Sequence, residues 1–249
     1  MVTKAAVLCG GEGTRLRPLT NYFQKTMIPI GSKKRPLLEY IVRLLAYNGI
    51  MDITLLTGYK SSEIEGYFED GAKFGVKLTY SRDPESTKGS AKSLQNAIAS
   101  GKLYGFDDLV VYYGDVLSDL NVRDLVASHQ AAGASVSLVI SREYRLPVGV
   151  ARVDGGKIVS FTEKPVMPLS VTMGCLAVSK DSLPLLKKAA EREGVADIMT
   201  HFVPAVIDAG LRVAPFYIDG FWYDVGTTEA YEKLDYEQVE ARMRFLDQA

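Results

Sequence analysis

Short apolar runs alternate with helically spaced apolar residues along the first half of the chain. Runs rich in Val, Ile, Leu and Tyr predict buried strands at residues 5–9, 52–58, 76–81 and 107–115. Between them, apolar side chains recur three or four residues apart, which predicts amphipathic helices. These helices are expected at residues 36–49, about 64–71 and about 91–100. Strands that alternate with helices predict a mostly parallel, doubly wound sheet.

The second half of the chain is richer in strands. Four apolar runs predict strands at residues 134–141, 148–154, 157–165 and 171–179, with Gly155 and Gly156 as a hairpin turn. Residues 181–194 and 197–210 have helical spacing, residues 211–226 predict one or two more strands, and residues 227–249 predict one charged amphipathic helix. The expected fold is α/β with a Rossmann-like, mixed sheet. We predict a single domain, 1–249, with lobes at about 1–130 and 131–249.

Composition limits the partners and the compartment. The chain has 249 residues, of which 47% are hydrophobic and 24% charged, and its net charge is −1. This balance predicts neither nucleic-acid nor membrane binding. The amino-terminal residues lack the pattern of a signal peptide, and Cys9 and Cys175 lie in apolar runs without a CxxC pair. We therefore expect buried thiols and a cytoplasmic protein.

Several hydrolytic chemistries lack their residues in this sequence. The two histidines, His129 and His201, lie in helical stretches and cannot build a His-rich zinc site with these cysteines. The sequence contains no G-x-S-x-G nucleophile elbow. Hydrolase interpretations are therefore disfavoured.

A glycine-rich loop follows the first predicted strand. Gly10, Gly11 and Gly13 end the run 5–9, and the cations Arg15 and Lys25 follow. Glycines allow backbone N–H groups to approach a ligand closely, and such concave loops bind anions. Together with the cations, the loop predicts a phosphate chain as ligand. The alternative is an ordinary turn with surface arginines.

Two familiar phosphate loops do not match this one. A Walker loop requires Gly-Lys-Ser/Thr, whereas the two Gly-Lys pairs, at residues 101–102 and 156–157, are followed by leucine and isoleucine. A dinucleotide fingerprint requires G-x-G-x-x-G, and the run from Gly11 has Leu16 in place of the last glycine.

Two aspartates are candidate metal ligands. Asp115 follows a predicted central strand, at the edge where α/β sheets bind ligands. Asp224 lies in the aromatic run GFWYDVG, where an isolated buried acid is costly without a partner. Carboxylates that face phosphates suit Mg²⁺. A solvated turn is the alternative for Asp115.

The ordered motifs resemble those of the sugar-1-phosphate nucleotidylyltransferase family. The run GGEGTRLRPLT matches the family's signature loop, and Lys25 takes the place of its phosphate-binding lysine, although Gln24 replaces the usual proline. YYGD, VGVARV, FTEKP and GFWYDVGTTEAY follow in family order. MGCLAVS keeps Gly174 but loses the asparagine and tyrosine of the family's segment. The matches extend from about residue 4 to 231.

The resemblance implies both a reaction and a set of site residues. The partners are an NTP and a sugar-1-phosphate, whose oxygen attacks the α-phosphorus and expels pyrophosphate, with Mg²⁺ as cofactor. Arg15 and Lys25 would be catalytic, and Asp115 and Asp224 would bind the metal. The implied nucleotide-binding residues are Leu8, Gly10, Gly11, Gly13, Thr14 and Gly89. The implied sugar-phosphate residues are Gly149, Glu163, Lys164 and Gly174.

Base, sugar and assembly are less sharply determined by these motifs. Residues 88–92, KGSAK, resemble the base loop of guanylyl- and some thymidylyltransferases more than the uridylyl type. The favoured interpretation is therefore a mannose-1-phosphate guanylyltransferase-like enzyme, with glucose-1-phosphate thymidylyl- or uridylyltransferase as alternatives. A non-catalytic, nucleotide-sugar-sensing relative and a nucleotide-binding scaffold also stay open. The final helix could pair two subunits in a homo-oligomer. Hexapeptide repeats of a carboxyl-terminal β-helix are absent from the sequence.

Overall fold

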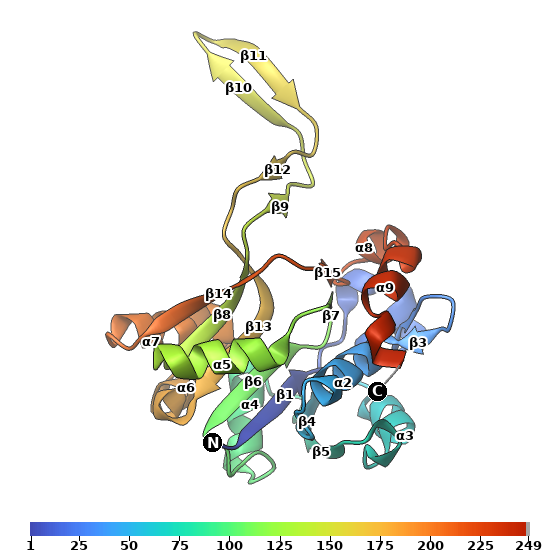
Figure 1. Ribbon diagram of the computed structural model, residues 1–249, viewed down its shortest axis with the longest axis vertical. Coiled ribbons are helices and arrows are strands. Elements are labelled where there is room, and N and C mark those ends of the chain that lie inside the picture. The colour runs from blue at the N-terminus through green and yellow to red at the C-terminus, as the bar shows by residue number, and fades with distance from the viewer. Residues whose placement is uncertain (248–249) are drawn as a thin grey trace.

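A seven-stranded sheet forms the centre of the computed structural model, which describes residues 1–247 (Figure 1). The strand order is β14-β8-β13-β6-β1-β4-β5. The bounds are β1 (Thr3–Leu8), β4 (Asp52–Thr57), β5 (Lys77–Arg82), β6 (Asp108–Tyr113), β8 (Val136–Ser141), β13 (Val171–Ser179) and β14 (Val213–Ile218). Only β13 runs antiparallel to its neighbours in this sheet. The predicted mixed, mostly parallel α/β fold is confirmed.

Helices cover both faces of the sheet. They are α1 (Leu19–Tyr22), α2 (Leu37–Tyr47), α3 (Ser61–Phe68), α4 (Ser90–Ala99), α5 (Val122–Ala132), α6 (Leu183–Ala190), α7 (Val203–Asp208), α8 (Thr228–Glu232) and α9 (Tyr236–Arg242). Short 3-10 or π turns occupy Thr14–Leu16, Lys25–Met27, Ala72–Phe74, Lys180–Ser182, Ile198–Phe202 and Arg244–Asp247. None of the helices within residues 1–247 has the length and apolar character needed to cross a bilayer.

Two buried apolar clusters lie on opposite faces of the sheet. Successive side chains of a strand point to opposite faces, so Val7 joins one cluster and Ala6 the other. The first cluster packs against α2, α3 and α5, and the second packs against α4, α6 and α7. This arrangement leaves the carboxyl ends of the parallel strands free to carry a site.

An extended arm, residues 142–170, projects from the body between β8 and β13 (Figure 1). Its outer part is a hairpin of β10 (Val150–Asp154) and β11 (Lys157–Thr162), and its root is the short pair β9 (Tyr144–Arg145) and β12 (Val166–Met167). Gly155 and Gly156 form the predicted turn, both with positive φ, as a two-residue hairpin turn requires. Every residue of β10 and β11 is exposed.

Two small strand pairs complete the described chain. β2 (Pro29–Ile30) pairs with β3 (Arg35–Pro36), and β7 (Val116–Ser118) pairs with β15 (Trp222–Asp224). The second pair joins segments that are more than a hundred residues apart in the sequence, and it places two predicted metal ligands next to each other.

The prediction of one continuous helix over residues 227–249 is wrong for the part that the structure describes. The segment divides into α8, α9 and a 3-10 turn, and residues 248–249 lie outside the described residues. The break follows from local capping, because the Asp235 side chain accepts a hydrogen bond from the Gln238 backbone N–H and begins a new helix. Leu234 is buried at the break.

Candidate active site

The glycine loop lies at the carboxyl edge of the sheet, directly after β1. The Leu8 carbonyl accepts a hydrogen bond from Gly114 N–H at 2.9 Å, and the Gly10 carbonyl accepts one from Tyr59 N–H at 3.1 Å. The loop is thus held between β4 and β6. Within residues 1–247, no protein acceptor meets the backbone N–H groups of Gly11, Glu12 or Gly13. These donors are available to an anionic ligand.

Gly13 packs directly against the stem of the predicted catalytic lysine. Its φ of +65° lies in the left-handed region, and a Cβ there would stand 3.0 Å from Lys25 Cβ and 2.8 Å from Thr20 Cγ2. Thr20 Oγ1 also donates to the Gly13 carbonyl at 2.9 Å. A side chain at position 13 would therefore displace the lysine.

Gln24, where the family pattern has proline, is completely buried, and both its side-chain nitrogen and its side-chain oxygen form hydrogen bonds. Its Nε2 donates to the Cys9 carbonyl at 2.6 Å, and its Oε1 accepts from Thr26 N–H at 2.6 Å. Its backbone N–H donates to Glu63 Oε2 on α3 at 2.6 Å. One side chain thus ties the glycine loop to the segment that carries Lys25.

Four predicted residues with charged side chains converge beside the loop. Lys25 Nζ forms an ion pair with Asp115, and both side chains are largely buried. Asp224 lies next to this pair because β15 pairs with β7, and Val225 N–H donates to the Asp115 carbonyl at 2.8 Å. Arg15 is the fourth member. A Cβ on Gly226 would stand 2.7 Å from Asp224 Oδ1 and 3.4 Å from Arg15 Nη2.

The surroundings of Asp224 disfavour its charged form. Solvent reaches its side chain, but the protein packed around it raises its pKa above the ordinary range, and the negative charge of Asp115 acts in the same direction. Lys25 and Arg15 oppose this shift. Two carboxylates that repel each other at one edge favour a bound cation.

These carboxylates fit a magnesium ion that also binds substrate phosphates. Within residues 1–247, no third His, Cys, Asp or Glu joins them to complete an all-protein metal cluster. Mg²⁺ is usually held by one or two carboxylates, with phosphate oxygens and water as its other ligands. Asp115 and Asp224 can supply the protein part of such a set.

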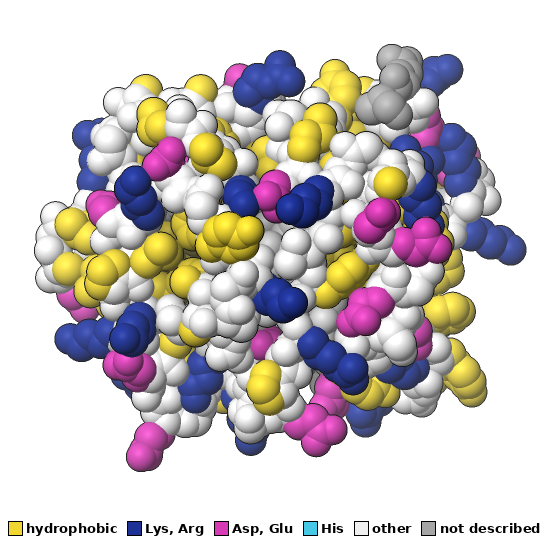
Figure 2. All heavy atoms as spheres, turned by 90° about the horizontal axis from the view of Figure 1, so that it is seen from below, with side chains coloured by type: hydrophobic (Ala, Val, Ile, Leu, Met, Phe, Trp, Pro, Cys, Tyr) yellow, Lys and Arg dark blue, Asp and Glu magenta, His cyan; other side chains and the backbone are white. Residues whose placement is uncertain are grey.

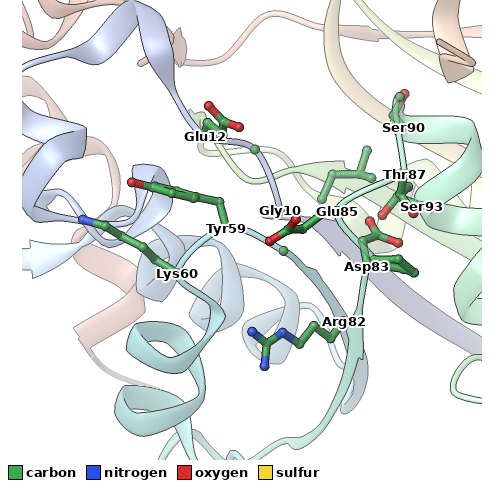
Figure 3. Close-up of a pocket in the computed structure, with 15 residues that line it drawn as sticks. Gly10, Glu12, Tyr59, Lys60, Arg82, Asp83, Glu85, Thr87, Ser90 and Ser93 are labelled. Carbon is green, nitrogen blue, oxygen red and sulfur yellow. The ribbon is translucent and has the colours of Figure 1, made fainter. Parts of the chain in front are cut away.

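A cleft of about 1180 Å³ opens on the other side of the glycine loop. Four of the six predicted nucleotide-binding residues line it, namely Leu8, Gly10, Gly11 and Gly89. Gly13 and Thr14 lie in the following turn, toward the charged cluster. Tyr59 and Lys60 stand on one side of the opening at Gly10, and Asp83 and Ser90 stand on the other (Figure 3).

Gly89 is constrained by packing as well as by its place in the cleft. Its φ is +101°, and a Cβ there would clash with the backbone of Ala196. Ala196 N–H donates to the Lys88 carbonyl at 3.0 Å, and Ala91 N–H donates to the Ala196 carbonyl at 2.9 Å. The predicted base loop is therefore joined to a segment more than a hundred residues away.

The predicted sugar-phosphate residues lie on or beside the arm. Gly149 and Glu163 face each other where the hairpin meets its root, since a Cβ on Gly149 would lie 2.7 Å from Glu163 Oε2. Lys164 follows Glu163 at this junction and has a positive φ of 47°. Gly174 lies against Tyr113 and Val116, beside Asp115.

Sequence reasoning missed part of this site. Tyr59, Lys60 and Asp83 line the cleft, but no motif marks them. Lys60 has a positive φ of 51° at the start of α3, a strained conformation that the sequence does not reveal. The structural role of Gln24 was also missed, and the only sign of it in the sequence was that glutamine replaces the family's proline at this position.

Comparisons with known proteins agree with this geometry. The family model described as nucleotidyl transferase matches residues 4–240. The chain is 32% identical over 246 residues to a UTP–glucose-1-phosphate uridylyltransferase of Synechocystis, with 92% of this chain and 61% of the relative covered. It is 34% identical over 236 residues to a glucose-1-phosphate thymidylyltransferase of Streptomyces griseus, with 90% and 62% covered. A mannose-1-phosphate guanylyltransferase of Mycobacterium tuberculosis is 30% identical over 237 residues, with 91% and 62% covered.

A solved Bacillus anthracis structure, named for glucose-1-phosphate thymidylyltransferase, has the same fold. Its TM-score is 0.73 at 23% identity, and the match covers 97% of this chain and 95% of that one. The chain spans about three fifths of the length of the curated relatives it matches. Because the family model covers nearly all of the sequence, the chain belongs to the nucleotidyl transferase family.

Proposed function

We propose that this chain is an NTP:sugar-1-phosphate nucleotidylyltransferase. The observation that carries the proposal is the convergence of Arg15, Lys25, Asp115 and Asp224 beside the glycine loop. The names of the relatives agree on this reaction class and differ in base and sugar. A sensing relative would not need this set of charges.

In the proposed reaction, an oxygen of the sugar phosphate attacks the α-phosphorus of the NTP. A new P–O bond forms, the bond between the α-phosphorus and the bridging oxygen breaks, and pyrophosphate leaves. The protein mainly positions the reactants and stabilises charge. The free N–H groups of Gly11 and Gly13 would hold the triphosphate, and Arg15 would bind the leaving pyrophosphate. Lys25 would neutralise phosphate charge between the two substrates.

Asp115 and Asp224 would hold Mg²⁺ when substrates bind. A bound Mg²⁺ would neutralise phosphate charge and help to keep the reacting groups in line. The ion pair with Lys25 holds the Asp115 carboxylate within the charged cluster. The sugar phosphate would lie toward the arm root, with Glu163 accepting hydrogen bonds from sugar hydroxyls and Lys164 contacting the phosphate.

The cleft favours guanine as the base. Asp83 is fixed by Asn96, whose Nδ2 donates to Oδ1 at 3.0 Å, and Oδ2 has no protein donor within residues 1–247. A carboxylate can accept from both the N1–H and the amino group of guanine. Uracil and thymine offer a single N–H between two carbonyl oxygens, which a carboxylate would repel. With mannose-1-phosphate, the product would be GDP-mannose. The alternatives are the thymidylyl and uridylyl reactions with glucose-1-phosphate.

Pyrophosphate release from a matrix of NTPs and sugar-1-phosphates tests the proposal, with the nucleotide sugar identified by mass spectrometry. We expect the highest kcat/KM with GTP, and Asp83→Asn should lower kcat/KM for GTP more than for UTP or dTTP. Glu85→Gln, an exposed carboxylate of the same cleft, is the matched control. A preference for UTP or dTTP would overturn the guanine assignment alone. Absence of release with every pair would overturn the enzyme assignment and favour a sensing role.

A further inference from the structure

The segment that leads to Lys25 crosses the surface of the protein before it turns inward. Residues 21–23 are all exposed. Gln24, directly after them, is completely buried, and the 3-10 turn Lys25–Met27 begins at the next residue. Exposed residues make few packing contacts that could fix their conformation. The position of Lys25 therefore depends on what holds the chain at Gln24.

The backbone at Gln24 has the conformation of a proline. Its φ is −60° and its ψ is 141°, and this φ lies in the range that a pyrrolidine ring imposes. Phe23 before it is extended, with φ −117° and ψ 145°, as residues before proline usually are. Proline would restrict this geometry covalently, and glutamine does not. In this chain, noncovalent contacts have to hold the same geometry.

Glu63 supplies such a contact, and a proline could not make it. Oε2 of Glu63, on α3, accepts a hydrogen bond from the Gln24 backbone N–H at 2.6 Å, and proline has no N–H to donate. Lys60, at the start of α3, donates from Nζ to the Asn21 carbonyl at 2.9 Å and lies 3.7 Å from Glu63 Oε1. The first turn of α3 thus holds the segment at both Asn21 and Gln24.

The contact of Glu63 with Gln24 differs from an ordinary surface ion pair. Charged side chains of both signs are interspersed over the face of the molecule away from the arm (Figure 2), and exposed ion pairs stabilise a protein little. The Glu63 side chain is 33% exposed, and its partner is the backbone N–H of a buried residue. Hydrogen bonds to a carboxylate are stronger than those between neutral groups. This bond can therefore fix the backbone next to Lys25.

We propose that Glu63 is a positioning residue for Lys25, and that its bond to Gln24 takes the place of the restriction that proline would impose. This inference rests on the proposed function, in which Lys25 lies between the two substrates. Misplacement of a catalytic group by about 1 Å can lower turnover about a hundredfold. Glu63 lies outside the lining of the cleft, so its loss should lower kcat rather than raise KM.

The kinetics of pyrophosphate release test this role. Glu63→Ala should lower kcat roughly 10–100-fold, with KM for the NTP and for the sugar-1-phosphate changed by no more than about twofold. Glu63→Gln retains an acceptor oxygen and should recover most of the lost turnover. Glu65→Ala, which removes a half-buried carboxylate from the same helix, is the matched control and should leave kcat unchanged. A normal kcat for Glu63→Ala, where the unmodified chain is active, would overturn the inference and leave the proposed function intact.

A proline at position 24 provides a sharper test. Gln24→Pro removes the N–H that Glu63 binds and imposes the same φ, so adding Glu63→Ala to it should lower kcat by no more than about a further twofold. An equal loss of turnover in both backgrounds would overturn the inference, because Glu63 would then act by another route. The single Glu63 variants decide the question if the proline variant does not fold.

Hydrogen exchange tests the positioning without any substrate. In Glu63→Ala, the Gln24 amide should exchange about tenfold faster or more than in the Glu65→Ala control, as measured by mass spectrometry on a peptide that spans residues 21–27. Unchanged exchange there would overturn the inference, whether or not the chain is an active enzyme. If the unmodified chain releases no pyrophosphate with any pair of substrates, the proposed function is overturned, and the role of Glu63 in turnover with it.

Discussion

The glycine loop and the arm carry the two halves of one candidate site, and they are held in place by different means. The loop is fixed by buried long-range contacts, as when Gln24 joins Cys9 to the segment of Lys25. The arm residues Gly149 and Glu163 lie directly beyond the paired ends of β10 and β11, where an exposed hairpin brings them together. Loop changes should therefore affect both chemistry and stability, and arm changes should affect sugar binding with little cost in stability.

The largest effect is expected on turnover, for the loss of Lys25 in the half of the site that the glycine loop carries. Lys25→Ala removes the charge that we propose to lie between the substrates, and it should lower kcat for pyrophosphate release by roughly 10²–10³-fold, the range for loss of a positioned electrostatic group. Circular dichroism should show an unchanged fold. Lys157→Ala, an exposed lysine of the arm, is the control and should leave kcat unchanged. Near-normal turnover of Lys25→Ala would rule out this role.

The next largest effect is expected for a residue of the arm, and it distinguishes the sugar-phosphate half of the site from the nucleotide half. Glu163→Gln would weaken the proposed hydrogen bonds from sugar hydroxyls, and bonds to a charged acceptor contribute about 1.5–3 kcal/mol. We expect KM for the sugar-1-phosphate to rise about tenfold or more, with KM for the NTP nearly unchanged. Initial-rate kinetics with each substrate varied in turn measures both constants. Equal changes in the two constants would contradict the division of the site.

The smallest effect concerns the stability of the loop. Gln24→Leu leaves the buried Cys9 carbonyl and Thr26 N–H without their partner, which should lower the free energy of unfolding by about 1–3 kcal/mol. Denaturant titration measures this change. Gln95→Leu, a partly exposed position on α4, is the matched control. If both variants are equally stable, the hydrogen bonds of Gln24 do not hold the loop.

Local pattern was sufficient to predict the strands of the central sheet and most of the helices between them, whereas most of the candidate site residues were predicted from the resemblance to family motifs. The apolar run of β6, the glycines after β1 and the Gly155–Gly156 turn are determined by neighbouring residues. The residues that these elements contact in space are not determined by neighbouring residues. The Lys25–Asp115 ion pair spans ninety residues, and the parallel pairing of β14 with β8 depends on the whole sheet.

The arm shows a second limit of local pattern. Alternating apolar and polar residues predict a strand equally well inside a sheet and outside it. The sequence therefore predicted β10 and β11, but it could not reveal that they leave the sheet and stand exposed. Similarly, helical spacing over residues 227–249 concealed the new helix start at Asp235, which depends on a single side-chain cap.

The contact between Gly89 and Ala196 limits how the predicted base loop, residues 88–92, could be redesigned. Ser90 N–H donates to Asp197 Oδ1 at 3.0 Å, and Ile198 N–H donates to Ser90 Oγ at 2.9 Å, so the loop and residues 196–198 form one hydrogen-bonded unit. A base loop transplanted alone from a relative would lose these partners. Both segments would have to be exchanged together, and a library that varies only residues 88–92 would sample mainly unstable proteins.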